Sequence, residues 1–127
     1  MVVCVTFGPF VLQPTEEALA QDGHNNLHIS ATLGACPDNP DARCIISVRV
    51  FTQNREVIVE GNKVYLNGRV ISLPYSDDVI YIKQATSLLI IIRGFSFSVT
   101  YDGNQRLYAN LGPYYENKVS HIAQCKL

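Results

Sequence analysis

Residues 54–111 form an almost uninterrupted ladder of short apolar runs separated by turn dipeptides, and this ladder constrains the fold most. Breaks such as Gly61-Asn62 and Asn67-Gly68 separate runs that recur about every ten residues, which is typical of an antiparallel sandwich or barrel. The chain is therefore predicted to be an all-β protein, an antiparallel β-sandwich or meander of about ten strands. The runs cover residues 56–60, 63–66, 69–75, 79–83, 87–93, 95–101 and 106–111.

The residues before this ladder predict two more strands and one short helix. Residues 27–33 alternate strictly between apolar and polar side chains, and residues 44–53 alternate again with Ile46, Val48 and Val50 on one face. The segment between them, residues 34–43, is predicted to be a polar loop. Residues 2–12 are compatible with a first strand. The stretch 14–21 (PTEEALAQ) is the one predicted helix, with proline in its first turn and Gly23 beyond its end.

A set of aliphatic and aromatic residues on the inward faces is expected to form the core. Residues 88–92 do not alternate, so both faces of that strand are expected to be covered and the strand belongs in the middle of the fold. From Gly112 the pattern fails, and residues 113–118 are predicted to be a loop. The expected core residues are Val48, Val50, Val64, Leu66, Leu88, Ile90, Ile92, Phe97, Val99 and Leu107.

Length and charge narrow the class of protein. A chain of 127 residues fits one domain, residues 1–127. Ten basic and eleven acidic side chains give a net charge of −1, which argues against nucleic acid as a partner. No apolar run reaches the roughly 18 residues that a membrane helix needs. Residues 1–12 carry no basic residue before their apolar part and do not look like a signal peptide, so either a signal has been removed or the chain is a fragment.

The residues that usually carry catalysis or bind metal are scattered. His28 is expected on the outward face of a strand and His24 and His121 in loops, without acidic residues at metal-ligand spacing. Asp77-Asp78 are adjacent residues in a turn, and turn chemistry explains them better than a carboxylate pair that binds metal or transfers protons. No serine-nucleophile or phosphate-binding motif is present. We therefore expect no enzyme, no catalytic residue, no metal site and no cofactor.

Three aromatic residues fall on faces opposite the apolar alternation, namely Phe51, Tyr65 and Tyr108. Tyrosine at a polar rim is a common contact residue at protein interfaces. Two interpretations stay open for these rings, a protein interface or burial beneath a second sheet. Burial is favoured because a sandwich has two inner faces.

The order of hairpins resembles the von Willebrand factor type D domain. Residues 63–75 (KVYLNGRVISLPY) are similar to the family's strand, Asn-Gly turn and Leu-Pro segment, and residues 95–103 (FSFSVTYDG) are similar to its later hairpin ending in Asp-Gly. Residues 107–119 resemble the strand and tyrosine-containing loop that follow. The resemblance is strongest over residues 27–119. The family's opening motif is absent, and Ser120 to Cys125 replace its closing cysteine motif.

This resemblance implies a non-enzymatic, extracellular module for protein interaction and assembly, part of a larger secreted protein of the mucin, matrix or adhesion type. Its partners would be other protein domains, including domains of the same parent protein. Two alternatives stay open: a module of a yolk lipoprotein, in which case lipid is a partner, and a module of a secreted luciferase-like enzyme. Because the family's calcium ligands lie in the end motifs that this chain lacks, the resemblance also implies that the calcium site is missing.

Four cysteines are present, none of them in a Cys-x-x-Cys pair. An even number in a small β protein suits disulfides in an oxidising compartment, and four free thiols in the cytosol is the alternative. Cys36 and Cys44 lie at the two mouths of the predicted loop between neighbouring strands, so we expect them to form a disulfide, as the resemblance also implies. Cys4 and Cys125 are then left for each other. The disulfide argument favours an extracellular location.

Overall fold

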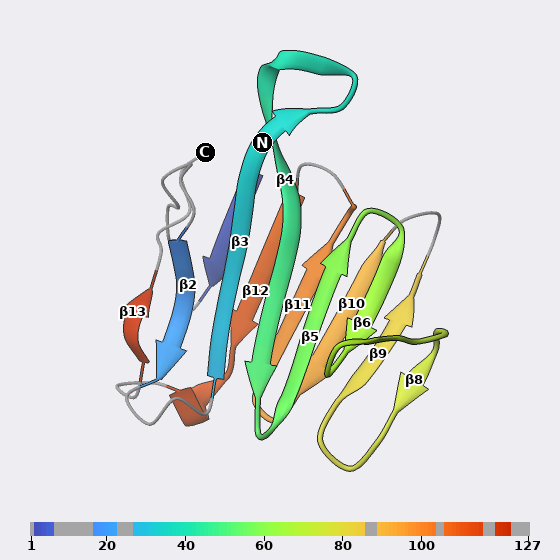
Figure 1. The fold of residues 1–127 in the computed structure, drawn as a ribbon. Coiled ribbons are helices and arrows are strands. Elements are labelled where there is room, and N and C mark those ends of the chain that lie inside the picture. Colours follow the sequence, from blue (N-terminus) through green and yellow to red (C-terminus); the bar gives the residue numbers. More distant parts are fainter. Residues whose placement is uncertain are drawn as a thin grey trace.

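Two β-sheets stacked face to face make up the computed structural model, which describes residues 2–6, 17–22, 27–85, 89–103, 106–115 and 119–122 (Figure 1). The predicted all-β class is confirmed, with thirteen strands in the described residues. The strands are β1 (Val2–Thr6), β2 (Glu17–Asp22), β3 (Leu27–Cys36), β4 (Asn39–Thr52), β5 (Arg55–Glu60), β6 (Lys63–Leu66), β7 (Arg69–Val70), β8 (Tyr75–Ser76), β9 (Tyr81–Gln84), β10 (Ile90–Gly94), β11 (Phe97–Tyr101), β12 (Arg106–Leu111) and β13 (Val119–Ile122), and a 3₁₀ helix, η1 (Pro113–Tyr115), precedes β13.

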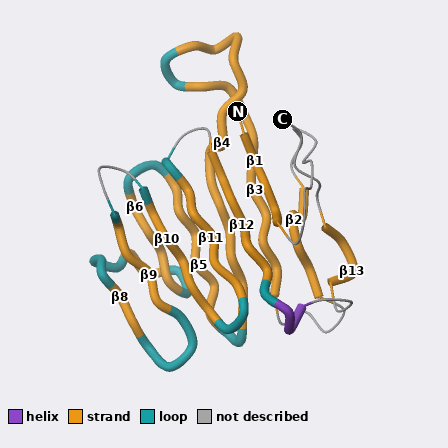
Figure 2. The backbone as a smooth tube through the Cα atoms, turned by 180° about the vertical axis from the view of Figure 1, so that it is seen from behind, coloured by secondary structure: helices purple, strands orange, loops and turns teal. Residues whose placement is uncertain are grey.

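The sheets are built mainly from neighbours in sequence. The order is β1-β12-β11-β10-β9-β8 in the six-stranded sheet and β13-β2-β3-β4-β5-β6-β7 in the seven-stranded sheet. Every described pair is antiparallel except β1 and β12, which run parallel. Figure 2 shows the two sheets from the opposite side. Most connections are hairpins, and the Asn67-Gly68 turn has positive φ at both residues, as the sequence predicts for a two-residue hairpin turn.

The core lies between the sheets because each strand turns alternate side chains inward. Along β12 the exposure alternates at every residue, with Leu107, Ala109 and Leu111 buried. Eight of the ten expected core residues are buried, Leu66 is half-buried, and Leu88 lies outside the described residues. The eight are Val48, Val50, Val64, Ile90, Ile92, Phe97, Val99 and Leu107. The expected central position of β10 is confirmed, although its outward-facing Ile91 is half-buried.

The predicted helix at residues 14–21 is wrong where the structure describes it. Glu17–Asp22 form strand β2, which pairs with β3 on one side and β13 on the other. Two helical turns are marginal in isolation, whereas a strand between two neighbours has partners for its backbone amides and carbonyls on both edges. Long-range pairing therefore overrides the local helix signal here.

The predicted inward position of Ile46 is also wrong, because β4 contains a β-bulge. Thr32 of β3 faces Ser47, but the next residue, Leu33, faces Ile45, so Ile46 has no partner across the ladder. Ile45 is consequently buried and Ile46 is exposed. A bulge shifts the alternation by one residue, and sequence periodicity alone does not show where that shift occurs.

Several smaller predictions are corrected in the same way. The run 69–75 divides into the short strands β7 and β8, and Phe95, the first residue of the predicted run 95–101, lies exposed in the β10–β11 turn. His121 lies in strand β13 and not in a loop, whereas His24 is outside the described residues. Pro113–Tyr115 form a 3₁₀ helix within the predicted loop. Of residues 2–12, the structure describes the first five as a strand.

A polar network ties the two sheets together beside the core. Arg55, at the start of β5, donates from Nε to Oδ2 of Asp77 at 2.8 Å, in the loop between β8 and β9. The hydroxyl of Tyr75 donates to the same oxygen at 2.7 Å, and the backbone amides of Val79 and Ile80 donate to Oδ1 at 2.7 and 2.9 Å. Burial alone would raise the pKa of Asp77, but these four hydrogen bonds outweigh it and hold the pKa well below its usual range.

Replacing Phe97 by alanine should lower the free energy of unfolding by roughly 2–5 kcal/mol, because the change leaves a cavity in the core. Phe95 is the matched control, since it is 59% exposed and touches Tyr114 only edge-on. Phe95→Ala should cost at most about 1 kcal/mol. Urea unfolding of both variants measures the difference, and equal midpoints would contradict the assignment of the inner face.

Asp77→Asn should destabilise the protein at neutral pH by about 1.5–3 kcal/mol, because it removes a charged hydrogen-bond acceptor. Since the native pKa of Asp77 lies below its unfolded value of about 3.9, the wild type gains this stability above that value and loses it as the pH falls. The gap between wild type and variant should therefore narrow from pH 6 to pH 3 in urea titrations. Asp78→Asn, at a side chain that is 88% exposed, should stay within about 0.5 kcal/mol of wild type.

Candidate functional site

The β3–β4 hairpin extends beyond the sandwich as a two-stranded ribbon (Figure 1). Strand β2 pairs with β3 only up to Ala31, and β5 pairs with β4 only from Ser47 onward. Residues 33–36 therefore pair with Ile45, Cys44, Arg43 and Asn39 and, among the described residues, with no third strand. We call this segment, residues 33–46, the projecting ribbon.

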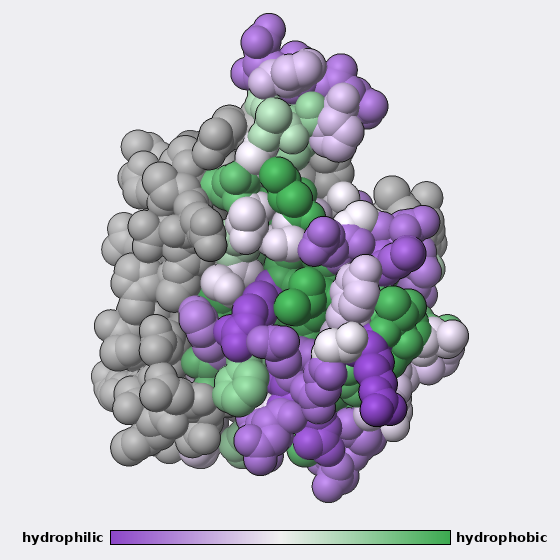
Figure 3. Space-filling view, in the orientation of Figure 1, coloured by the Kyte–Doolittle hydropathy of each residue, from purple (hydrophilic) through white to green (hydrophobic). Residues whose placement is uncertain are grey.

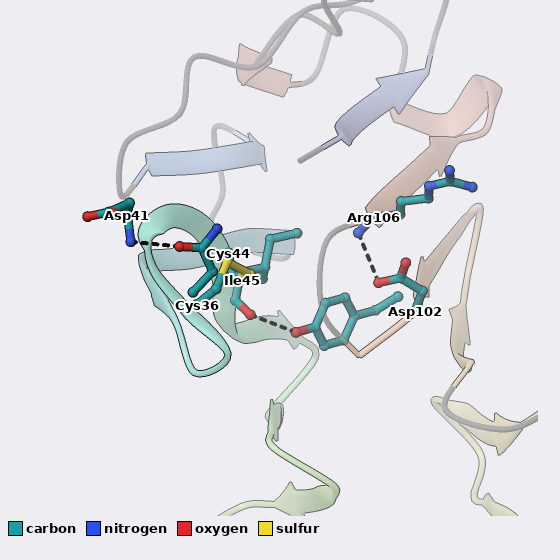
Figure 4. Close-up of a disulfide and its surroundings, with 8 residues drawn as sticks. Cys36, Asp41, Cys44, Ile45, Asp102 and Arg106 are labelled. Atoms are coloured by element: carbon teal, nitrogen blue, oxygen red, sulfur yellow. Dashed lines mark hydrogen bonds between the residues drawn. A yellow bond between two sulfur atoms is a disulfide. The ribbon is translucent and has the colours of Figure 1, made fainter.

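A disulfide closes the projecting ribbon near its tip. Cys36 and Cys44 are joined with their Cα atoms 4.9 Å apart, inside the range that disulfides require (Figure 4). This bond agrees with the sequence prediction. Cys4 lies in β1 and Cys125 lies outside the described residues, so a bond between those two stays a prediction.

The tip of the ribbon is hydrophilic, as the space-filling view shows at the end that stands clear of the sandwich (Figure 3). The side chains of Pro37, Asp38 and Asp41 are exposed, and the Asp41 amide donates to Oδ1 of Asn39 at 3.2 Å. The two disulfide-bonded cysteines beneath them are buried. The ribbon thus combines a buried disulfide with a polar outer surface.

The root of the ribbon is fixed to the opposite sheet. The hydroxyl of Tyr101, on β11, donates to the backbone carbonyl of Ile45 at 3.0 Å, and both residues are buried (Figure 4). Burial, followed by the negative charge of Asp102, raises the pKa of Tyr101 to about 12, so its hydroxyl stays protonated at neutral pH. One hydrogen bond therefore connects the ribbon to the core of the six-stranded sheet.

The prediction of a polar loop over residues 34–43 is wrong, because these residues continue the hairpin down to a two-residue turn at Pro37-Asp38. The composition, with two prolines and two aspartates, suggests a loop. Proline is tolerated in a strand whose outer edge is unpaired, and Pro40 lies in such a strand. An unpaired ribbon can accept residues that a central strand rejects.

The structure does not bring the three candidate interface residues together. Phe51 on β4 and Tyr65 on β6 lie on the outer face of the seven-stranded sheet, where both are half-buried. Tyr108 on β12 belongs to the six-stranded sheet and is 38% exposed. No second sheet covers these rings among the described residues. They cannot belong to one contact surface, because they lie on two different sheets.

The outer face near Phe51 is occupied by a charged cluster. Arg49 lies over the Phe51 ring at 5.5 Å, and its Nε donates to Oε2 of Glu56 at 2.8 Å. Its Nη1 lies 3.2 Å from Nδ1 of His28. Burial, and then the charge of Arg49, lower the pKa of His28 below its usual value. Arg49, Glu56, His28 and Phe51 therefore form a network of contacts on the outer surface of the sheet.

Groups that could hold a metal ion or carry catalysis are not assembled in the part of the chain that the structure describes. No cluster of three His, Cys, Asp or Glu side chains is placed to bind a metal there. Both oxygens of Asp77 already accept two hydrogen bonds each, which supports the turn interpretation of Asp77-Asp78. No described helix is long and apolar enough to cross a membrane.

Sequence periodicity missed one exposed aromatic pair. The ring of Phe95 meets that of Tyr114 edge-on with centroids 4.9 Å apart, and Tyr114 meets the buried Tyr115 at 5.0 Å. Ser96, with φ of 60°, accepts from the Gly112 amide at 2.6 Å and so joins this turn to η1. The proximity of residues 95 and 114 is a long-range contact without a local sequence signal.

Comparison with known proteins agrees with this architecture. A search of curated proteins gives no significant match. A family model, the von Willebrand factor type D domain, matches residues 10–120, which is most of the chain and includes the projecting ribbon and strands β2 to β12. The match spans the segment whose hairpins resemble the family in sequence. The chain therefore belongs to the von Willebrand factor type D domain family.

Proposed function

We propose that this domain is a non-enzymatic, extracellular module for protein interaction and assembly within a larger secreted protein. Type D domains are generally non-enzymatic modules of extracellular adhesion and assembly proteins, and family membership is the first support. The single observation that carries the proposal is the projecting ribbon, residues 33–46, closed by the Cys36–Cys44 disulfide.

The ribbon has the physical properties of a contact element. An isolated two-stranded hairpin is marginally stable in water, so the disulfide and the Tyr101–Ile45 hydrogen bond hold it in one conformation. A segment that is already ordered loses less conformational entropy when it binds. Its exposed polar tip contributes nothing to the sandwich core, which supports a role toward another protein.

The disulfide also supports the extracellular location. Disulfides persist in secreted proteins and are reduced in the cytosol. In a closed loop as short as that between Cys36 and Cys44, such a bond contributes about 2–3 kcal/mol through the unfolded state. A bond that stabilises the module in this way is useful only in an oxidising compartment.

A photo-crosslinking amino acid at position 38, the ribbon tip, should crosslink the secreted domain to a protein partner. The control carries the same group at the exposed position 93, on β10 of the other sheet. Crosslinked products are measured by mass spectrometry of material secreted by cultured cells. Products from position 38 and not from position 93 support the proposal, whereas equal yields from both positions, or none from either, would contradict it.

In the double variant Cys36→Ala/Cys44→Ala, the free energy of unfolding should be about 2–3 kcal/mol lower than in wild type. The variant should also lose the crosslink from position 38. Alkylation of the native, unreduced wild type measures the thiols independently. If Cys36 reacts freely there, the disulfide is absent in solution and the extracellular assignment loses its main support.

A further inference from the structure

One turn of the sandwich combines exposure with a chemically labile sequence. Asn67 and Gly68 form the two-residue turn between β6 and β7, and both are exposed. When glycine follows asparagine, the glycine amide nitrogen attacks the side-chain carbonyl carbon of asparagine readily, because no Cβ shields that nitrogen. A Cβ atom at Gly68 would meet no non-neighbouring residue within 4 Å, and among the described residues the Gly68 amide donates no hydrogen bond. The nucleophile of this reaction is therefore accessible.

The electrophile, the side-chain amide of Asn67, is held by the neighbouring β4–β5 hairpin. Its Oδ1 accepts from the Glu56 amide at 2.8 Å, and its Nδ2 donates to the Asn54 carbonyl at 3.3 Å. The main-chain amide of Asn67 also donates to the Glu56 carbonyl, at 2.9 Å. We call these three hydrogen bonds the Asn67 clasp. They join the turn between β6 and β7 to the turn between β4 and β5.

The clasp acts on an attack at Asn67 in two opposite ways. The Glu56 amide would stabilise the negative charge that develops on Oδ1. At this exposed position, however, water donates to the same oxygen once the side chain is released, so the gain over water is small. The attack also requires Asn67 to turn Cγ toward the Gly68 nitrogen and to give up its hydrogen bond to Asn54. The clasp therefore slows the reaction more than it assists it.

Deamidation of Asn67 needs only water as a co-reactant. The Gly68 nitrogen loses its proton to water and bonds to Cγ, the Cγ–Nδ2 bond breaks, and ammonia leaves a cyclic imide. Water then opens the imide. Attack of water on Cγ gives aspartate, and attack on the main-chain carbonyl carbon gives isoaspartate, in which the chain runs through Cβ and Cγ.

Either product weakens the clasp. Aspartate keeps an acceptor for the Glu56 amide but replaces the Nδ2 donor by a charged oxygen that faces the Asn54 carbonyl. Isoaspartate adds a carbon atom to the backbone of a turn whose φ values, 49° at Asn67 and 85° at Gly68, fit a two-residue hairpin. Strand β7 is the edge of its sheet and pairs only with β6 among the described strands, so no second neighbour holds it in place.

We propose that Asn67 is a spontaneous deamidation site, that the clasp restrains the reaction, and that conversion to aspartate or isoaspartate releases the turn between β6 and β7. The proposal goes beyond the assembly function and does not depend on it. It assigns to this turn a modification that accumulates with the age of the protein.

Peptide mapping by mass spectrometry of the native domain, aged at neutral pH, tests the site. Asn67 should convert, and enzymatic methylation of isoaspartate should label the same peptide. Asn62 is the internal control, because it is exposed in the β5–β6 turn but is followed by Lys63. It should convert at least about tenfold more slowly, since a side chain shields the next amide. No conversion at Asn67, or equal conversion at Asn62, would overturn the site.

The pair Glu56→Pro and Glu56→Ala tests the restraint. Both variants lose the ion pair with Arg49, but only proline lacks the amide that donates to Oδ1 of Asn67. Conversion should be about fivefold faster in Glu56→Pro than in Glu56→Ala, the effect of one hydrogen bond. Equal rates would overturn the restraint, and a slower rate in Glu56→Pro would show that the Glu56 amide activates Asn67 instead.

The unfolded wild type gives a second measurement of the restraint, which does not require Glu56→Pro to fold. In guanidinium chloride, Asn67 should convert at least about tenfold faster than in the native domain, because no clasp is present there. The same rate in both states would overturn the restraint.

Hydrogen exchange followed by NMR tests the release. In the isoaspartate form, separated from aged protein by ion exchange, the amide of residue 67 should exchange about fivefold faster than in unmodified protein, because its bond to the Glu56 carbonyl opens more often. The amide of Val99, on β11 between β10 and β12, is the control and should not change. Unchanged exchange at residue 67 would overturn the release.

Discussion

The fold depends on the mutual covering of two apolar faces. Each sheet turns every second side chain inward, and neither sheet has another element in the described residues that buries this face. Residues such as Val50 on one sheet and Val99 on the other are fully buried for this reason. A polar group that enters this layer needs a partner, and the Tyr101 hydroxyl has one in the Ile45 carbonyl.

The bulge at Ile46 lets the β3–β4 hairpin belong to the seven-stranded sheet at one end and project from it at the other. Below it, β4 lies between β3 and β5 and buries Val48 and Val50. Above it, the strand leaves the sheet, and its shifted alternation turns Ile45 inward, while Cys44 is buried in the disulfide. Ile46 packs against Gly34, where a larger residue would collide with it. The bulge therefore makes the disulfide and the tyrosine anchor compatible with the sandwich.

Features set by residues that lie close together in the chain could be predicted from the sequence, whereas pairing between distant strands could not. The Asn67-Gly68 turn, the alternation of β12 and the Cys36–Cys44 bond follow from residues that lie close together in the chain. Strand β2 and the parallel β1–β12 pair depend on partners far along the chain, so their segments carried a helix signal or no orientation signal.

The sandwich and the projecting ribbon are stabilised by different kinds of interaction. The sandwich is held by buried aliphatic side chains and by the Arg55–Asp77 pair between the sheets, none of which involves sulfur. The ribbon contributes only Leu33 and Ile45 to the core, and beyond the β3–β4 ladder it is held by one disulfide and one hydrogen bond to the opposite sheet. Loss of the Cys36–Cys44 bond is therefore expected to loosen the ribbon first, because local openings begin where buried contacts are fewest.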